Sequence, residues 1–189
     1  ILIGLVGSEM CIRDRCSAHF LWVGERTRDI HSPHIEFLKG VSNPIGIKIS
    51  EKIQNQELVN LIRTLNPENE CGKITLITRF GVDTIRDHLP RLIKTIRRNH
   101  LSVVWCCDPM HGNTKTIENN IKTRFYDDIL KELTYFFEIH RRMGTFGGGI
   151  HLEMSPEMVT ECIDNEIVHK ENITERYMSK CDPRLNRLQ

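Results

Sequence analysis

Short apolar runs alternate with amphipathic stretches along most of this 189-residue chain. The apolar runs lie at residues 19–24, 44–50, 74–80, 102–110 and 148–154. Each run is rich in Ile, Val, Leu, Trp or Phe and is too short for a helix, as expected of a strand covered on both faces. Strands that alternate with helices indicate parallel pairing through right-handed crossovers. The pattern therefore predicts an α/β fold.

Four stretches between and after these runs predict helices, at residues 54–65, 83–99, 119–143 and 156–166. In the third stretch, apolar residues recur every three or four positions from Ile121 to Phe136 and form one stripe. Ser155 and Pro156 suit the N-cap and the first position of the fourth helix. Pro90 lies inside the second stretch and predicts a kink or a break there.

The charge balance argues against two classes of partner. Lys and Arg number 26 and Asp and Glu number 25, a net charge of +1. Neither a basic face for nucleic acid nor a polyanionic tail follows from such a balance. No apolar run approaches the ~18 residues of a membrane span. We therefore expect a cytoplasmic protein without a nucleic-acid or membrane partner.

The seven cysteines include no CxxC motif, which indicates a reduced intracellular protein rather than a disulfide scaffold. Cys106 and Cys107 are neighbours in one apolar run and invite comparison with a structural zinc site. Adjacent strand residues point to opposite faces, however, so the two thiols do not easily ligate one ion. Packing as small core residues is the favoured interpretation.

The first fifteen residues, ILIGLVGSEMCIRDR, do not continue into the strand and helix pattern. The chain lacks an initiator Met, and the string VGSEMCIRDR resembles translated sequencing-adapter read-through. We expect residues 1–15 to be a non-native segment and residues 16–189 to form the domain.

Charged residues stand at or just after the end of each apolar run. They are Glu25, Arg26, Lys48, Arg79, Asp108, His111, His151 and Glu153. Ligands of parallel barrels and open α/β sheets bind at the carboxyl ends of the strands, so the pattern predicts a ring of site residues. Arg26, Lys48 and Arg79 offer three cations to a small polyanion such as a phosphorylated acid. The alternative is that each pairs with a carboxylate of its own loop.

His111, Glu153 and Asp182 form a second candidate group, placed on strand ends or in the loop after the last strand. One nitrogen and two carboxylates suit Mn²⁺, Fe²⁺, Co²⁺ or Zn²⁺. His151 competes with His111 for this role, and Asp108 competes with Asp182.

Several segments carry a resemblance to a known family. They are SAHFLWVGERTR (17–28), NPIGIKIS (43–50), LITRFG (76–81), CDPMHGNT (107–114), GGIHLEM (148–154), TEC (160–162) and CDPRLN (181–186). In this order they resemble type II 3-deoxy-D-arabino-heptulosonate 7-phosphate (DAHP) synthase, the plant and bacterial form. The resemblance implies a (β/α)₈ TIM barrel, of which residues 16–189 would be the C-terminal portion, about strands four to eight.

The resemblance also implies a reaction: a metal-dependent, aldol-like condensation of phosphoenolpyruvate with erythrose 4-phosphate that releases phosphate. This is the first step of the shikimate pathway, which leads to chorismate and the aromatic amino acids. The residues it assigns to phosphoenolpyruvate are Glu25, Arg26, Lys48 and Arg79. Those it assigns to catalysis are Lys48, His111 and Glu25.

The metal ligands implied by the resemblance are His111, Glu153 and Asp182. Mn²⁺ is the favoured ion, with Co²⁺, Fe²⁺, Zn²⁺ and Cd²⁺ as alternatives. The family's fourth ligand, a cysteine of the first barrel strand, has no match in this chain. Membership further implies a homo-oligomer at full length, and a plastid location if the source is a photosynthetic eukaryote.

Three other functions remain open. A Schiff-base aldolase would use Lys48, since a lysine among cations can be held neutral. A non-catalytic relic would bind phosphoenolpyruvate or a sugar phosphate without a complete metal shell. A paralogue in secondary metabolism would perform the same chemistry, and we expect the fragment alone to be inactive.

Overall fold

The computed structural model describes residues 18–189, so the expectation for residues 1–15 lies outside it. Its main sheet is built from β1 (Leu21–Val23), β2 (Ile45–Ile49), β3 (Ile74–Thr78), β4 (Val104–Cys107) and β7 (Gly149–Ile150). These strands are neighbours in this order, and every pairing between them is parallel. They fall within the five predicted runs, with shorter bounds. The parallel α/β prediction is confirmed.

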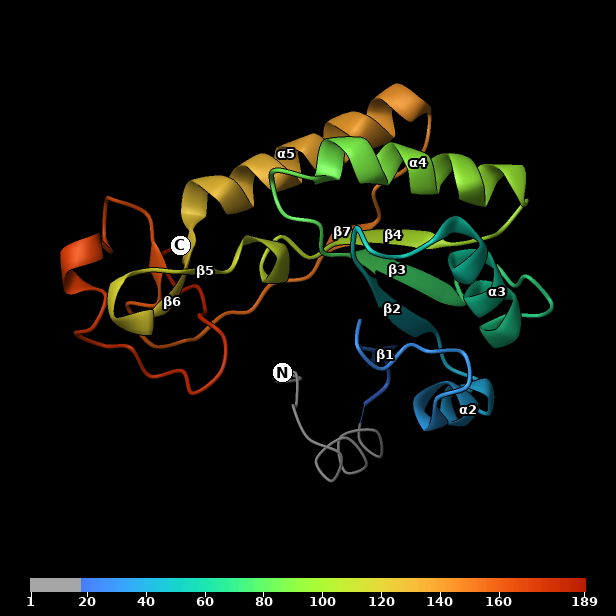
Figure 1. Cartoon of the computed structure of the whole chain (residues 1–189), viewed down its shortest axis with the longest axis horizontal. Helices are drawn as coiled ribbons and strands as arrows, with labels where there is room; N and C mark the ends of the chain where they lie inside the picture. The colour runs from blue at the N-terminus through green and yellow to red at the C-terminus, as the bar shows by residue number, and fades with distance from the viewer. Residues whose placement is uncertain (1–17) are drawn as a thin grey trace.

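The long helices form one layer. They are α2 (Pro33–Lys39), α3 (Asn55–Leu65), α4 (Ile85–Arg98) and α5 (Tyr126–Met143). Consecutive helices pack on each other, and Figure 1 shows α4 and α5 side by side over one face of the sheet. A single helix layer on a parallel sheet is the arrangement of a βα barrel, whereas a doubly wound sheet has helices on both faces. No helix within residues 18–189 is long and apolar enough to cross a membrane.

Strand pleating separates the helix-facing core from the other face of the sheet. The three isoleucines of β2 are fully buried in the main core, whereas Gly46 and Lys48 alternate with them and point the other way. A Cβ atom on Gly46 would lie 2.8 Å from the Cβ of Trp22, so this second face is also closely packed. Cys107 packs in the helix-facing core, as predicted, and Cys106 is half-buried on the opposite face.

The helix α4 runs through Pro90 without a break. Leu89, Leu92 and Ile93 are buried on either side of the proline, and their packing holds the helix together where the backbone hydrogen bond is lost.

The third predicted helix begins later than expected. Asn119 and Asn120 have positive φ angles of 60° and 58°, which a right-handed helix excludes. Residues 118–120 therefore form only a short turn, with non-helical φ and ψ angles at Asn119. β6 (Lys122–Phe125) follows before α5 begins at Tyr126.

The fourth predicted helix is wrong, because residues 156–166 contain no helix. The Oγ of Ser155 accepts the N–H of Glu157 at 3.2 Å, but the chain then becomes extended. β8 (Cys162–Ile163) pairs with β6, which also pairs with β5 (Lys115–Thr116). The buried carboxylate of Glu161 accepts backbone N–H groups of residues 178, 179 and 184 and the guanidinium of Arg184. Long-range hydrogen bonds thus stabilise a loop where the local sequence favours a helix.

Candidate functional site

The carboxyl ends of the parallel strands bring charged residues to one edge of the sheet. The backbone ladder continues past the strand ends: the N–H of Arg79 donates to the carbonyl of Ile49 at 2.9 Å. Likewise the N–H of Asp108 donates to the carbonyl of Thr78 at 2.7 Å. Lys48, one residue before the end of β2, lies beside these positions. The register therefore fixes this edge as the candidate site.

Asp108 is the centre of the ionic network at this edge. Its fully buried carboxylate contacts the ammonium of Lys48 through Oδ2, which also lies 2.7 Å from Nδ1 of His111. Oδ1 accepts the backbone N–H groups of Met110, at 3.1 Å, and His111, at 3.2 Å. Burial alone would raise the pKa of Asp108, but hydrogen bonding to His111 and the charge of Lys48 lower it well below its usual range. Asp108 is therefore a carboxylate that orients both partners.

His111 directs its second ring nitrogen at a group of acidic ligands. Nε2 lies 3.2 Å from Oε1 of Glu153. One ligand atom from each of His111, Glu153 and Asp182 lies within 4.8 Å of the other two. Ligand atoms about 2.0–2.2 Å from a shared ion are at most about 4.4 Å apart, so the three groups lie near the spacing of ligands that share one ion. One imidazole and two carboxylates are a donor set that fits a first-row divalent cation.

The electrostatics of this group favour a positive charge between its members. Burial lowers the pKa of His111, but hydrogen bonds to Asp108 and Glu153 raise it, and the net shift is upward. Burial raises the pKa of Glu153, yet its hydrogen bond to His111 and the charge of Arg124 bring it down to about 2. Glu153 is thus an anion, and Asp108 holds the His111 ring by Nδ1 with Nε2 facing the acidic ligands.

Asp182 reaches the cluster because the chain returns beside the segment after β7. The N–H of Leu185 donates to the carbonyl of Glu153 at 3.0 Å, and the N–H of Ser155 donates to the carbonyl of Leu185 at 2.8 Å. Lys122 lies 3.4 Å from Oδ1 of Asp182. This pairing of the returning chain brings Asp182 into the cluster, although Asp182 lies 71 positions after His111 in the sequence.

The two competitors from the sequence lie outside the three-residue cluster. His151 packs edge-on against Trp22, with ring centroids 5.2 Å apart, and burial lowers its pKa. Asp108 binds Lys48 and supports the ring of His111 instead.

The predicted phosphoenolpyruvate residues differ in their surroundings. Lys48 is paired with Asp108, a carboxylate of another strand rather than of its own loop. Within residues 18–189 the guanidinium groups of Arg26, which is exposed, and Arg79, which is half-buried, have no hydrogen bond or ion pair. Glu25 accepts from Arg28 at 2.9 Å and from the hydroxyl of Ser50 at 2.7 Å. Their convergence on one anion remains a prediction.

Sequence analysis missed two buried charged residues beside this edge. Arg124 of β6 donates to Oε2 of Glu153 at 2.7 Å. Glu132 of α5 accepts the N–H of Gly81 at 3.0 Å and the side-chain amide of Asn113 at 2.7 Å. One signal was present: Glu132 occupies the apolar stripe of the predicted helix, where an unpaired carboxylate is unusual.

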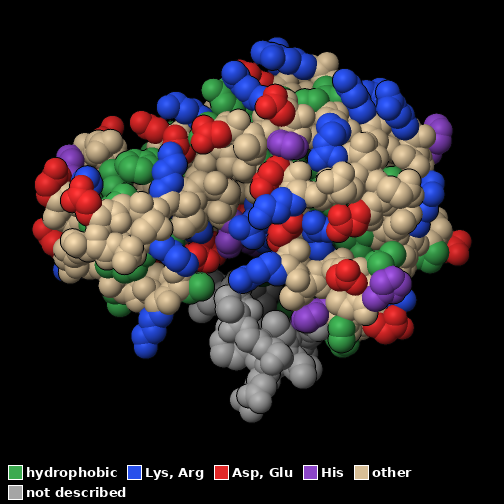
Figure 2. Space-filling view, viewed as in Figure 1, with side chains coloured by type: hydrophobic (Ala, Val, Ile, Leu, Met, Phe, Trp, Pro, Cys, Tyr) green, Lys and Arg blue, Asp and Glu red, His purple; other side chains and the backbone are tan. Residues whose placement is uncertain are grey.

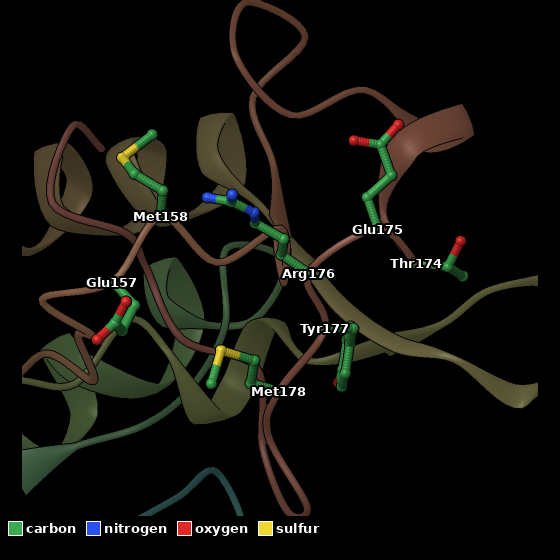
Figure 3. A pocket seen from close by; sticks show the side chains of 7 residues that line it. All are labelled: Glu157, Met158, Thr174, Glu175, Arg176, Tyr177 and Met178. Atoms are coloured by element: carbon green, nitrogen blue, oxygen red, sulfur yellow. The ribbon is translucent and has the colours of Figure 1, made fainter.

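Figure 2 shows acidic, basic and histidine side chains around a hollow near the middle of the face drawn. A separate pocket is shown in Figure 3. Its lining consists of Glu157, Met158, Thr174, Glu175, Arg176, Tyr177 and Met178. None of the predicted site residues lines this second pocket, so the candidate site is the strand-end network.

Comparison with known proteins connects this chain to one family. The model of the Class-II DAHP synthetase family matches residues 10–189. A phospho-2-dehydro-3-deoxyheptonate aldolase of Neurospora crassa is 45% identical over 176 residues, 92% of this chain and 37% of the relative. The enzyme of that name from Streptomyces coelicolor is 44% identical over 174 residues, 92% of this chain and 39% of the relative. A Catharanthus roseus protein named "Probable phospho-2-dehydro-3-deoxyheptonate aldolase, chloroplastic" is 47% identical over 173 residues, 90% of this chain and 33% of the relative.

Solved structures agree on the fold. Phospho-2-dehydro-3-deoxyheptonate aldolase of Francisella tularensis aligns with a TM-score of 0.58 and 16% identity, covering 89% of this chain and 50% of that one. Its Thermotoga maritima counterpart gives a TM-score of 0.52 and 16% identity, covering 85% and 44%. These are TIM-barrel enzymes, so the prediction of a portion of a (β/α)₈ barrel is confirmed.

The curated relatives are longer than this chain, which spans only 33–39% of their length. The alignments with these relatives cover 90–92% of this chain. With a family match from residue 10 to the last residue, this chain belongs to the class-II DAHP synthetase family.

Proposed function

We propose that this chain forms the part of a DAHP synthase active site that holds phosphoenolpyruvate and a divalent metal ion. The reaction would be the aldol-like condensation of phosphoenolpyruvate with erythrose 4-phosphate, with release of phosphate. The observation that carries the proposal is the cluster of His111, Glu153 and Asp182 at the sheet edge that also bears Lys48 and Arg79. Family membership supplies the reaction, and the cluster supplies a place for its metal.

The proposed metal ligands are His111, Glu153 and Asp182, and Mn²⁺ is the preferred ion among Mn²⁺, Co²⁺, Fe²⁺, Zn²⁺ and Cd²⁺. The chemistry that such an ion supplies when bound is polarisation of the aldehyde oxygen of erythrose 4-phosphate. Asp108 keeps the Nδ1 proton of His111 in place, which leaves Nε2 as the ligand atom. The family pattern implies a fourth ligand, which would be the thiolate of a cysteine on the first strand of the barrel.

The cations of the proposed anion site differ in whether they already have an ion-pair partner. Arg26 and Arg79 have no partner within residues 18–189, so their planar groups are available to the carboxylate and phosphate of phosphoenolpyruvate. Lys48 adds a fixed charge, because Asp108 holds its ammonium at the strand end. Glu25, fixed by Arg28 and Ser50, would position the water that attacks the former enol carbon.

The ion pair between Lys48 and Asp108 argues against a Schiff-base aldolase. Attack on a carbonyl needs a free lysine amine, whereas the Nζ of Lys48 is held in an ion pair with the buried carboxylate of Asp108. A non-catalytic relic is an alternative that the assays below distinguish. A secondary-metabolism paralogue would perform the same chemistry and would differ only in the pathway that it serves. A homo-oligomer and a cytoplasmic or plastid location complete the proposal; gel filtration with light scattering tests the first.

Metal and substrate binding by the 189-residue chain test the proposal directly. Titration with Mn²⁺, followed by electron paramagnetic resonance, is expected to show one site, with electron spin-echo modulation from a histidine nitrogen. Calorimetry is expected to show phosphoenolpyruvate binding at that stoichiometry. Absence of nitrogen-coordinated Mn²⁺ would contradict the metal assignment.

Turnover is tested in a hybrid polypeptide in which residues 18–189 replace the matching segment of the Streptomyces coelicolor relative. Phosphate release that requires both substrates and is abolished by a chelator is expected. Binding of phosphoenolpyruvate without turnover, in a hybrid that unfolds cooperatively, would favour the relic.

Replacing Arg79 with alanine is expected to weaken phosphoenolpyruvate binding by about 10- to 100-fold, since a hydrogen bond to a charged group contributes about 1.5–3 kcal/mol. Because Arg79 has no partner within residues 18–189, its loss leaves no buried group unpaired there. Calorimetry measures the dissociation constant. The control is Arg63→Ala, which removes an exposed arginine of α3 that donates to Asn99 at 3.3 Å. Equal affinities in the two variants would refute the role of Arg79.

A further inference from the structure

Arg124 is the largest fully buried side chain within residues 18–189. From β6 its Nη1 donates to Oε2 of Glu153 at 2.7 Å and also contacts the carbonyl oxygen of Pro183. Its Nε donates to the hydroxyl of Thr114 at 3.0 Å. A charged side chain that is wholly withdrawn from water requires such partners. These three partners share a feature, which is the kind of segment to which each belongs.

Each partner belongs to a segment that carries one of the clustered ligands. Thr114 follows His111 by three residues, Glu153 is itself a member, and Pro183 directly follows Asp182. The strand that bears Arg124 is not part of the main sheet, because β6 pairs only with β5 and β8 in the described chain. One side chain from outside the sheet therefore joins all three ligand-bearing segments.

We propose that Arg124 is a positioning residue that sets the geometry of Glu153 and Asp182 for the cation; this inference rests on the proposed metal function. Its hold on Oε2 of Glu153 leaves Oε1 directed at Nε2 of His111, 3.2 Å away. Its contact with the carbonyl of Pro183 fixes the backbone next to Asp182. A planar guanidinium offers donors in fixed directions, which a lysine ammonium does not.

The remaining donor of Arg124 supports a role beyond folding. Nη2 is buried and has no hydrogen-bond partner among the described residues. An unsatisfied buried donor costs about 1–3 kcal/mol, so the arrangement is poor as a purely structural one. Arg184 provides the contrast, because its Nε and Nη2 donate to both oxygens of Glu161 in a paired structural contact.

The test compares Mn²⁺ affinity in the 189-residue chain carrying Arg124→Lys with that of the unmodified chain. Arg124→Lys keeps the charge and loses the planar donors. We expect Mn²⁺ binding, followed by electron paramagnetic resonance, to weaken about 10- to 100-fold, as for other residues that orient metal ligands. The Mn²⁺ spectrum is expected to broaden because the carboxylate geometry changes. Thr114→Ala removes the partner of Nε together with the hydroxyl's own hydrogen bond to the carbonyl of Met110 at 3.3 Å, and it is expected to weaken binding severalfold.

The control is Arg91→Lys, which alters an arginine that donates to the carbonyl of Ile53 and to Asn55 and contacts none of the three ligands. Its Mn²⁺ affinity is expected to equal that of the unmodified chain. An Arg124→Lys chain that unfolds cooperatively and binds Mn²⁺ with unchanged affinity and spectrum overturns the inference. If Arg124→Lys does not fold, Thr114→Ala decides: weaker binding supports the inference and unchanged binding overturns it.

Failure of the proposed function has a different signature. An unmodified chain that binds no Mn²⁺ overturns the metal function, and the inference falls with it. Normal Mn²⁺ binding by the unmodified chain together with unaltered binding by Arg124→Lys overturns the inference alone.

Discussion

Replacing Asp108 with alanine is expected to lower the free energy of unfolding by about 3–5 kcal/mol, because it leaves a buried ammonium without its counter-ion. The side chain of Asp108 is 0% exposed and that of Lys48 is 5% exposed, so water cannot take the place of the carboxylate. The substitution also removes the acceptor of the Met110 and His111 N–H groups. Urea unfolding followed by circular dichroism at pH 7 measures the loss.

The matched control for this variant is Asp164→Ala. The carboxylate of Asp164 also accepts backbone N–H groups, those of residues 166, 167 and 168, but in a surface loop without a buried cation. Its loss is expected to cost about 0.5–2 kcal/mol, as for other carboxylates that cap free N–H groups. The double variant Asp108→Ala, Lys48→Met is expected to recover part of the loss, because no charge is then left unpaired. Equal losses in the two single variants, or no recovery in the double variant, would contradict the central role of Asp108.

The strands of the main sheet could be predicted because they are determined locally. A parallel strand covered on both faces is a continuous apolar run, and β2 and β3 are nearly such runs. The placement of charged residues at the strand ends follows from the same pattern, since parallel strands end at one edge. Lys48, Arg79 and Asp108 lie at that edge in the structure.

The partners of those residues could not be predicted, because they depend on contacts between distant segments. Asp108 was a candidate metal ligand, but the register of β2 and β4 around β3 brings it to Lys48, 60 residues earlier. Residues 156–166 have the local signature of a helix, yet Glu161 accepts donors from the returning chain 17–23 residues later. Arg124 falls within the predicted third helix, and only the pairing of β6 with β8 brings it into contact with Glu153.

Glu132 gives the second large expected effect, a fall in stability with rising pH. The loops after β3 and β4 cross where it lies: a Cβ on Gly112 would be 2.3 Å from the nitrogen of Gly81. Burial raises the pKa of Glu132 to about 8, the N–H of Gly81 opposes this rise, and the charge of Asp108 adds to it. Between pH 4.5, the ordinary value for this group, and pH 8, the folded chain holds a proton that the unfolded chain has released. Stability from this group is therefore fully present below pH 4.5 and declines up to pH 8.

The substitution Glu132→Gln removes this titration, so the stability of the variant relative to the unmodified chain is expected to rise with pH. At about 1.4 kcal/mol per pKa unit, the relative gain between pH 4.5 and pH 8 is on the order of 4 kcal/mol. The pKa of His111 is also raised, so the stability that this group contributes also declines as pH rises. His111 is present in both chains, so its contribution cancels in the difference between their stabilities. Urea unfolding at intervals of half a pH unit measures both curves. The control is Glu138→Gln, which alters a glutamate of the same helix that lies 3.6 Å from Arg142. Parallel curves for the unmodified and Glu132→Gln chains would show that Glu132 is ionised throughout, stabilised by the donors of Gly81 and Asn113 despite its burial.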